Sequence, residues 1–143
     1  MKAVVIGLGS MGKRRVRLIN QYDTGMEIIG VDSNVERRAE SEAVFGIKTC
    51  ASLAESGAME GDAALVCSSP LSHASLITDC LNRKMHVFTE LNLVMDRYDE
   101  NISLEKKLHA YYFFRLRSFT VRKTNLLSMW HKIPSNRCIT PTT

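Results

Sequence analysis

The sequence predicts an α/β protein with a doubly wound parallel sheet, folded as a single three-layer domain and followed by an irregular basic tail. Short apolar runs alternate with helical stretches from residue 2 to about residue 105, an alternation typical of parallel sheets covered by helices. The first apolar run ends in three closely spaced glycines. Later runs end in small polar or acidic residues, at the edge where open α/β sheets bind ligands.

The glycine pattern G-x-G-x-x-G follows the apolar residues 3–6 and opens a helical stretch. Gly7 permits a tight turn, Gly9 lets a pyrophosphate approach the backbone, and Gly12 lets the helix lie close to the strand. The helix is expected to begin near Ser10 or Met11, so that its free N–H groups and positive dipole end face the pyrophosphate. We therefore predict that the whole segment binds a dinucleotide cofactor: Gly7, Leu8, Gly9, Ser10, Met11 and Gly12.

This first helix should continue to about residue 22. Val16 and Ile19 stand three positions apart on one face, which is expected to contact the sheet. The arginines Arg14, Arg15 and Arg17 are expected elsewhere on the helix.

Asp32 ends the second apolar run, residues 26–31, and stands 20 positions after Gly12. A carboxylate there accepts hydrogen bonds from the adenosine ribose hydroxyls and repels a 2′-phosphate. Asp32 and the adjoining Ser33 are therefore predicted to bind the cofactor, and NAD is favoured over NADP. Arg37 and Arg38 weigh against that preference, since a nearby arginine can receive a 2′-phosphate. The alternative is a glycine turn in another kind of βαβ unit, with Asp32 an ordinary strand end.

The remaining elements follow from the same periodicities. Asn34 is suited to cap, and Gly46 to end, a helix over residues 35–45. Further strands are predicted over residues 47–50, 63–67, 86–89 and 109–114, and further helices over 52–59, 72–83 and 95–108. Residues 1–114 would then form the dinucleotide-binding domain.

Ser68, Ser69 and Pro70 directly follow the predicted strand 63–67. Small hydroxyl residues and a proline at the carboxyl end of a parallel strand stand where open α/β sheets bind ligands. All three are therefore predicted to contact the cofactor.

Composition limits the classes of protein that fit. The chain has 143 residues, 45% hydrophobic and 24% charged, which suits one domain able to bury a core. It has no apolar stretch of roughly 18 residues and no signal-peptide pattern, so we predict a cytoplasmic protein with no membrane partner. The four cysteines show no C-x-x-C spacing, which favours buried thiols over disulfides and predicts no metal site.

The order of these features resembles the nucleotide-binding half of the Gfo/Idh/MocA oxidoreductases, the glucose–fructose oxidoreductase and inositol dehydrogenase group. The resemblance covers roughly residues 2–105 and implies a Rossmann fold. The matching pieces are residues 4–12, Asp32 with residues 36–40, residues 45–46, 62–66, 70–73 and 86–90.

The resemblance also implies an activity and further site residues. It implies an NAD-dependent hydride transfer to or from a CH–OH group of a sugar, sugar nucleotide or cyclitol. It further implies that His73 and Glu90 lie at the cofactor cleft. For His73, the alternative is a capped or surface histidine of the following helix.

Two departures from the family put turnover in question. The family continues the last matched strand with Glu-Lys-Pro, and its lysine acts in proton transfer at the nicotinamide. This chain has Glu90-Leu91-Asn92, and a leucine exchanges no proton, so the catalytic residues are left unknown. Family members also carry a substrate domain, whereas only about 40 residues follow here, so a sugar-like substrate is expected only if a second domain is supplied. An exposed sheet edge left by that absence would favour a homo-oligomer.

Residues 106–143 carry 8 Lys/Arg and no acidic residue, whereas residues 1–105 carry 11 Lys/Arg and 15 Asp/Glu. Three interpretations of the basic tail, residues 115–143, stay open: a nucleic-acid-binding arm, a short helix or docking segment, and non-native sequence from the out-of-frame end of a truncated gene. Nucleic acid is disfavoured because the preceding domain is acidic and no recognition motif is present. The out-of-frame interpretation is favoured. Two alternatives to an active oxidoreductase also stay open: a non-catalytic dinucleotide-binding module and a truncated remnant without turnover.

Overall fold

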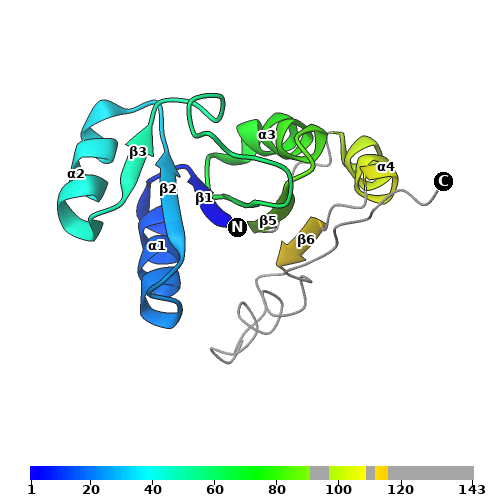
Figure 1. The fold of residues 1–143 in the computed structure, drawn as a ribbon. Helices are drawn as coiled ribbons and strands as arrows, with labels where there is room; N and C mark the ends of the chain where they lie inside the picture. Colours follow the sequence, from blue (N-terminus) through cyan, green and yellow to red (C-terminus); the bar gives the residue numbers. More distant parts are fainter. Residues whose placement is uncertain (91–96, 109–111, 116–143) are drawn as a thin grey trace.

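The computed structural model describes residues 1–90, 97–108 and 112–115 of the chain (Figure 1). Six strands and four helices alternate within these ranges. Their bounds are β1 Lys2–Ile6, α1 Ser10–Tyr22, β2 Glu27–Val31, α2 Val35–Phe45, β3 Lys48–Cys50, β4 Ala63–Val66, α3 Pro70–Asn82, β5 His86–Glu90, α4 Tyr98–Leu108 and β6 Tyr112–Arg115.

All six strands pair in parallel in the order β3-β2-β1-β4-β5-β6. The chain first builds the sheet outward from β1 to β3. It then returns to the centre and builds outward again from β4 to β6, as Figure 1 shows. This order confirms the predicted doubly wound parallel sheet.

Helices α1 and α2 pack on one face of the sheet, and α3 and α4 pack on the other. Successive strand residues point to opposite faces, so β1 contributes to both layers. Val5 belongs to the same hydrophobic cluster as Val16 of α1. Val4 and Ile6 belong to the cluster that contains Ile77 of α3. The three predicted layers are therefore present.

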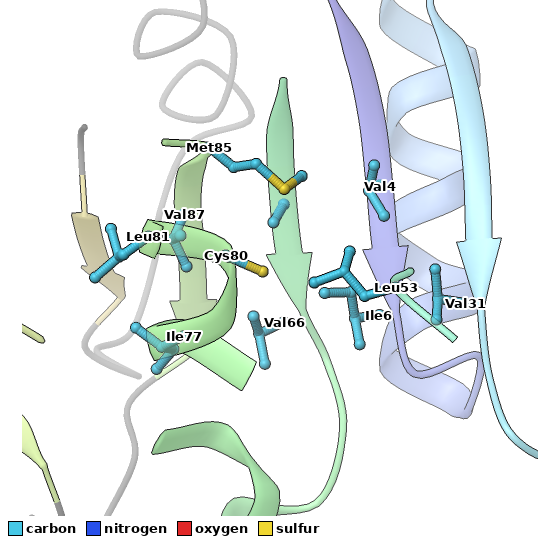
Figure 2. Packing of buried hydrophobic residues seen from close by; sticks show 11 residues of the cluster. Val4, Ile6, Val31, Leu53, Val66, Ile77, Cys80, Leu81, Met85 and Val87 are labelled. Atoms are coloured by element: carbon cyan, nitrogen blue, oxygen red, sulfur yellow. The ribbon is translucent and has the colours of Figure 1, made fainter. Parts of the chain in front are cut away.

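The larger core lies between the sheet and α3 (Figure 2). Ile77, Cys80 and Leu81 of α3 face Val66 of β4 and Val87 of β5, and each of these side chains is at most 1% exposed. Fully burying a side chain such as Leu, Ile or Val contributes about 1.5–3 kcal/mol. The packing holds α3, and hence the loop before it, against β4 and β5.

A polar link joins α4 to α3, two helices that lie next to each other (Figure 1). The Thr78 hydroxyl lies 2.8 Å from Asn101 Oδ1, and both residues are buried. A buried hydrogen bond of this kind helps to fix the relative position of two helices, because the Asn101 carbonyl would lose its Thr78 partner if they moved apart.

The helix over Val35–Phe45 is confirmed with both of its predicted ends. Asn34 Oδ1 accepts a hydrogen bond from the Arg37 N–H at 2.9 Å, as an N-cap does. Gly46 has φ +64°, the left-handed conformation that ends many helices.

The predicted short helix over residues 52–59 is wrong, because the segment forms turns. The Ser56 hydroxyl donates to the Leu53 carbonyl at 2.6 Å, and Ser52 bonds the Glu55 carboxylate at 2.7 Å. A serine side chain that bonds nearby backbone, as Ser56 does, competes with helix formation. Gly57, at φ +60°, then turns the chain away.

The basic tail lies almost wholly outside the described residues. Strand β6 extends to Arg115, one residue past the predicted domain boundary, and residues 116–143 are not described. The division into residues 1–114 and 115–143 therefore stays a prediction.

Candidate functional site

The sheet reverses its strand order between β1 and β4. The loops that follow these two central strands lie against each other, because a Cβ added to Gly7 would be 2.8 Å from backbone atoms of Cys67 and Ser68. Helices α1 and α3 both begin at this edge, at Ser10 and Pro70. Open α/β sheets bind ligands in the crevice at such a reversal, so this edge is the candidate site.

Two glycines of the G-x-G-x-x-G pattern are required by the fold itself. Gly7 has φ +94° and donates its N–H to the Val31 carbonyl at 2.7 Å. A Cβ on Gly12 would lie 1.8 Å from the Gly7 carbonyl oxygen, so α1 passes directly against the turn. The structure agrees with the turn predicted at Gly7 and with the close helix packing predicted at Gly12.

Gly9 is different, because nothing in the described chain demands a glycine there. Its backbone is extended, with φ −69° and ψ −166°, and no described heavy atom lies within 4 Å of an added Cβ. The open space adjoins the start of α1, whose first N–H groups have no partner inside the helix. The first turn of α1 contains no acidic residue, and Gly9 provides no side-chain cap. An anionic group that approaches the backbone closely fits this position.

The residues around Gly9 divide into one that faces the core and two that face outward. Leu8 is 0% exposed and packs against Gly30, where an added Cβ would lie 2.9 Å from Leu8 Cδ1. Ser10 is exposed and Met11 is half-buried in the first turn of α1. Leu8 therefore anchors the turn in the core, and the backbone of Ser10 and Met11 remains at the helix end.

The Asp32 carboxylate joins the end of β2 to the glycine turn. Its Oδ2 accepts a hydrogen bond from the Leu8 N–H at 2.7 Å, and its Oδ1 accepts one from the Asn34 N–H at 2.9 Å. Asp32 is only 8% exposed. A carboxylate offers about four acceptor positions, so these two bonds leave acceptor capacity for a hydroxyl group beside the turn.

Two arginines of α2 lie beside Asp32. Arg38 Nη1 donates to the carbonyl oxygens of Asp32 and Ser33, at 2.7 and 3.1 Å. Arg37 Nη1 lies 3.7 Å from Asp32 Oδ2, and its side chain is 55% exposed. Ser33 is also exposed. The backbone thus holds one of these positive charges in place, while the other faces solvent.

The loop after β4 carries a small hydroxyl cluster. Ser72 donates to Ser68 Oγ at 2.9 Å, and its hydroxyl also lies 2.9 Å from the Ser69 carbonyl oxygen. Pro70 occupies the first position of α3, where its missing N–H has no consequence. Ser69 and Pro70 are exposed. The predicted serine–proline segment therefore lies at the candidate site, with Ser72 tying it to the helix.

His73 connects the ends of β4 and β5. Its Nε2 lies 2.8 Å from the Ser68 carbonyl oxygen, and its Nδ1 lies 3.3 Å from the Thr89 hydroxyl. A carbonyl only accepts, so Nε2 carries the proton and Nδ1 accepts from Thr89. His73 is 5% exposed, so it is not a surface histidine, and its role at the cofactor cleft stays a prediction. His73 thus links Ser68, after β4, to Thr89, which stands one residue before the end of β5.

Glu90 is the last residue of β5, and the structure describes its backbone. Leu91 and Asn92, which stand where the family has lysine and proline, lie outside the described residues.

A buried arginine next to the site was not expected from the sequence. Arg15 was expected away from the core face, yet it is 2% exposed and its guanidinium carbon lies 5.2 Å from the Phe88 ring centroid. The available signal was spacing, since Gly12, Arg15 and Ile19 follow the i, i+3, i+7 pattern of one helix face.

Two of the thiols that the structure describes, those of Cys50 and Cys80, are poor nucleophiles. Burial raises the pKa of the Cys80 thiol to about 12. Burial and the neighbouring Glu55 carboxylate also raise the pKa of Cys50. Since the thiolate is the reactive form of cysteine, neither residue is suited to covalent catalysis.

Among residues 1–90, 97–108 and 112–115, no cluster of three His, Cys, Asp or Glu side chains is arranged to hold a metal ion. Within the same ranges, no helix is long and apolar enough to span a membrane.

The fold and this edge of the sheet define a Rossmann-type nucleotide-binding domain. The chain also matches a family model described as the Gfo/Idh/MocA oxidoreductase family, NAD-binding Rossmann fold, over residues 1–113. The chain therefore belongs to the Gfo/Idh/MocA family, and it is a dinucleotide-binding domain of that family.

Solved structures share the fold of this chain. A probable dehydrogenase from Thermotoga maritima is 30% identical, with a TM-score of 0.71 over 80% of this chain and 35% of its own. The WlbA dehydrogenase from Chromobacterium violaceum, solved with NADH and UDP-GlcNAcA, is 16% identical with a TM-score of 0.71 over 80% and 34%. KijD10, a 3-ketoreductase from Actinomadura kijaniata solved with NADP and TDP-benzene, is 18% identical with a TM-score of 0.70 over 80% and 37%.

The last two proteins, being less than 25% identical, establish a shared fold alone. The chain spans about a third of the length of these solved proteins. No curated protein sequence matches the chain significantly.

Proposed function

We propose that this chain binds NAD as the nucleotide-binding domain of an oxidoreductase that acts on a sugar, sugar nucleotide or cyclitol. The observation that carries the proposal is the open space at Gly9. Gly7 and Gly12 are required by the packing of the chain itself. Gly9 is not, and a ligand that reaches its backbone explains why a glycine stands there. The cofactor's diphosphate is the anionic group of the right kind, and the first turn of α1 supplies its N–H groups.

The remaining site residues follow from the direction in which a dinucleotide extends from its diphosphate. On the β2 side, Asp32 accepts hydrogen bonds from the adenosine ribose, with Ser33 beside it. On the β4 and β5 side, the other half meets the serine–proline loop, fixed through His73, and the end of β5. The residues proposed to form this half are Ser68, Ser69, Pro70, His73 and Glu90.

NAD is proposed in preference to NADP. The Asp32 carboxylate repels the 2′-phosphate of NADP, and the Arg38 guanidinium is already bonded to two backbone carbonyls. Arg37 is the opposing feature, because its exposed charge can meet a 2′-phosphate. The WlbA structure contains NADH and the KijD10 structure contains NADP, so the choice within the fold depends on local charges such as these.

When bound, the nicotinamide ring supplies hydride donation or acceptance. This chain has Leu91 where the family has its proton-transferring lysine, and Leu91 exchanges no proton. That substitution supports a second candidate function, a dinucleotide-binding module without turnover. The two candidates share the cofactor site and differ in whether any substrate is converted.

The proposal is tested by calorimetric titration of NAD and NADP against paired aspartate variants. Asp32→Asn removes the charge at the proposed ribose site. Asp62→Asn is the matched control, because Asp62 is also buried and also accepts two backbone N–H bonds, from Lys2 at 2.8 Å and Met59 at 2.9 Å. Asp62 lies at the opposite edge of the sheet, directly before β4.

We expect Asp32→Asn to weaken NAD binding about tenfold, the equivalent of one charge-assisted hydrogen bond. We also expect the ratio of NAD affinity to NADP affinity to fall. We expect Asp62→Asn to leave both affinities within about twofold of the original chain. Equal effects of the two variants would contradict the assignment of Asp32. Turnover of a polyol or sugar by the chain would favour the enzyme over the binding module.

A further inference from the structure

Arg15 is a buried cation next to the proposed site. It lies in the second turn of α1, three residues after Gly12, and is 2% exposed. Burying a charge is costly, and replacing buried ions by apolar side chains of similar volume is often neutral or stabilising. What Arg15 contacts in the folded chain therefore decides its role.

One contact of Arg15 reaches across the sheet to Phe88. Its guanidinium carbon lies 5.2 Å from the centre of the Phe88 ring. Phe88 is in β5, two residues before the strand ends at Glu90, and β5 is separated from β1 by β4. The Arg15 side chain thus connects α1, the helix proposed to bind the diphosphate, with β5, which lies beyond β4 on the other side of the candidate site.

A second arginine of α1 makes a similar contact in the other direction. The Arg17 guanidinium carbon lies 5.9 Å from the ring centre of Phe45, the last residue of α2. Arg17 is exposed, whereas Arg15 is buried. A cation over an aromatic ring interacts more strongly when it is desolvated, so the Arg15 contact is the stronger restraint of the two.

A dinucleotide that places its diphosphate at α1 and its adenosine ribose at Asp32 extends its other half toward β4 and β5. The position of the end of β5 relative to α1 then decides how well the nicotinamide half is held. We propose that Arg15, through Phe88, is a positioning residue for the nicotinamide half of the site. This inference rests on the proposed dinucleotide function.

The test separates the two halves of the cofactor. ADP-ribose contains the adenosine, the diphosphate and one further ribose without nicotinamide, and its affinity is measured by calorimetry. NADH affinity and the environment of its ring are measured by nicotinamide fluorescence, whose emission moves to shorter wavelength when the ring leaves water. The variants are Arg15→Met, Phe88→Leu, which keeps an apolar side chain and removes the ring, and Arg17→Met as the matched control. Thermal unfolding establishes that each variant is folded.

We expect Arg15→Met and Phe88→Leu to bind ADP-ribose within about twofold of the original chain, to bind NADH about fivefold more weakly, and to lose the emission shift. Arg17→Met should keep all three properties. An unchanged NADH signal in both Arg15→Met and Phe88→Leu would overturn the proposal. Equal losses for ADP-ribose and NADH would also overturn it, because Arg15 would then act on the diphosphate or on the fold.

Failure of the original chain to bind ADP-ribose would instead refute the dinucleotide function itself, and the role of Arg15 with it. Binding of ADP-ribose by the original chain without any nicotinamide signal would overturn the positioning role alone.

Discussion

Replacing Gly9 or Gly12 by alanine should separate ligand binding from folding, because the added Cβ meets open space in one case and backbone in the other. At Gly12 the Cβ would lie 1.8 Å from the Gly7 carbonyl oxygen and 2.9 Å from the Gly7 carbonyl carbon. Overpacking typically costs about 1–3 kcal/mol, and an overlap with rigid backbone belongs at or above the upper end. For a domain of this size, about 3 kcal/mol lowers the Tm by roughly 10 °C.

Gly9→Ala should have the opposite profile. With an ordinary φ of −69° and no described heavy atom within 4 Å of the added Cβ, the folding cost is the loss of an N-cap glycine, within about 1 kcal/mol. The Cβ would still enter the space proposed for the diphosphate. We expect NAD affinity to fall by about tenfold or more.

The two variants are compared by thermal unfolding followed by far-UV circular dichroism and by calorimetric titration with NAD. Each has its own decisive readout, since Gly12→Ala should lose stability and Gly9→Ala should lose affinity. Full NAD affinity in Gly9→Ala would refute the role of the open space. An unchanged Tm in Gly12→Ala would refute the close packing of α1 on the turn.

Three further predictions concern groups away from the cofactor. Thr78→Val should lower the free energy of unfolding in urea by about 1–3 kcal/mol, because it leaves the buried Asn101 carbonyl unsatisfied, whereas Thr78→Ser should keep most of the stability. Burial lowers the pKa of His86, so on acidification the unfolded chain binds a proton at a higher pH than the folded chain does. The free energy of unfolding should therefore decline as pH falls below about 6.5, and the decline should be shallower in His86→Gln. Burial raises the pKa of Cys80 to about 12, so Cys80 should resist alkylation by iodoacetamide at pH 7 in the folded chain and react once urea unfolds it. Peptide mapping measures both labelling rates, and equal rates with and without urea would contradict the prediction.

Periodicity predicts much of this fold because the strongest signals are local and agree with each other. The run before Gly7 is apolar on both faces of the strand, which suits a parallel strand covered by helices on either side. Asn34 and Gly46 mark both ends of α2, since a side-chain cap and a left-handed residue are set within a few residues of chain.

The features that were not predicted depend either on contacts between segments far apart in the sequence or on side-chain hydrogen bonds that compete with a short helix. Arg15 is buried because Phe88, 73 positions further along the chain, lies beneath α1. The turns after Ser52 replace a helix because the Ser56 hydroxyl bonds the nearby Leu53 carbonyl. Neither outcome is decided by hydrophobic period alone.

Within the site, the residue types were predictable and their partners were not. The spacing of Asp32 from Gly12 predicts a carboxylate that binds the ribose of the cofactor. Nothing in that spacing shows that Asp32 also accepts a hydrogen bond from the Leu8 N–H. His73 likewise could be placed after a strand end, whereas its bonds to Ser68 and Thr89 require β4 and β5 to be neighbours.

The sharpest test of dinucleotide binding is a titration of the ¹⁵N-labelled chain with NAD, followed through its backbone amide resonances. We predict saturable shifts at Gly9, Ser10 and Met11 and at Ser33, while Lys84, in the turn before β5 at the opposite edge of the sheet, stays unchanged. Shifts confined to the opposite edge, or no saturable shift in a folded chain, would contradict the placement of the cofactor at the reversal between β1 and β4.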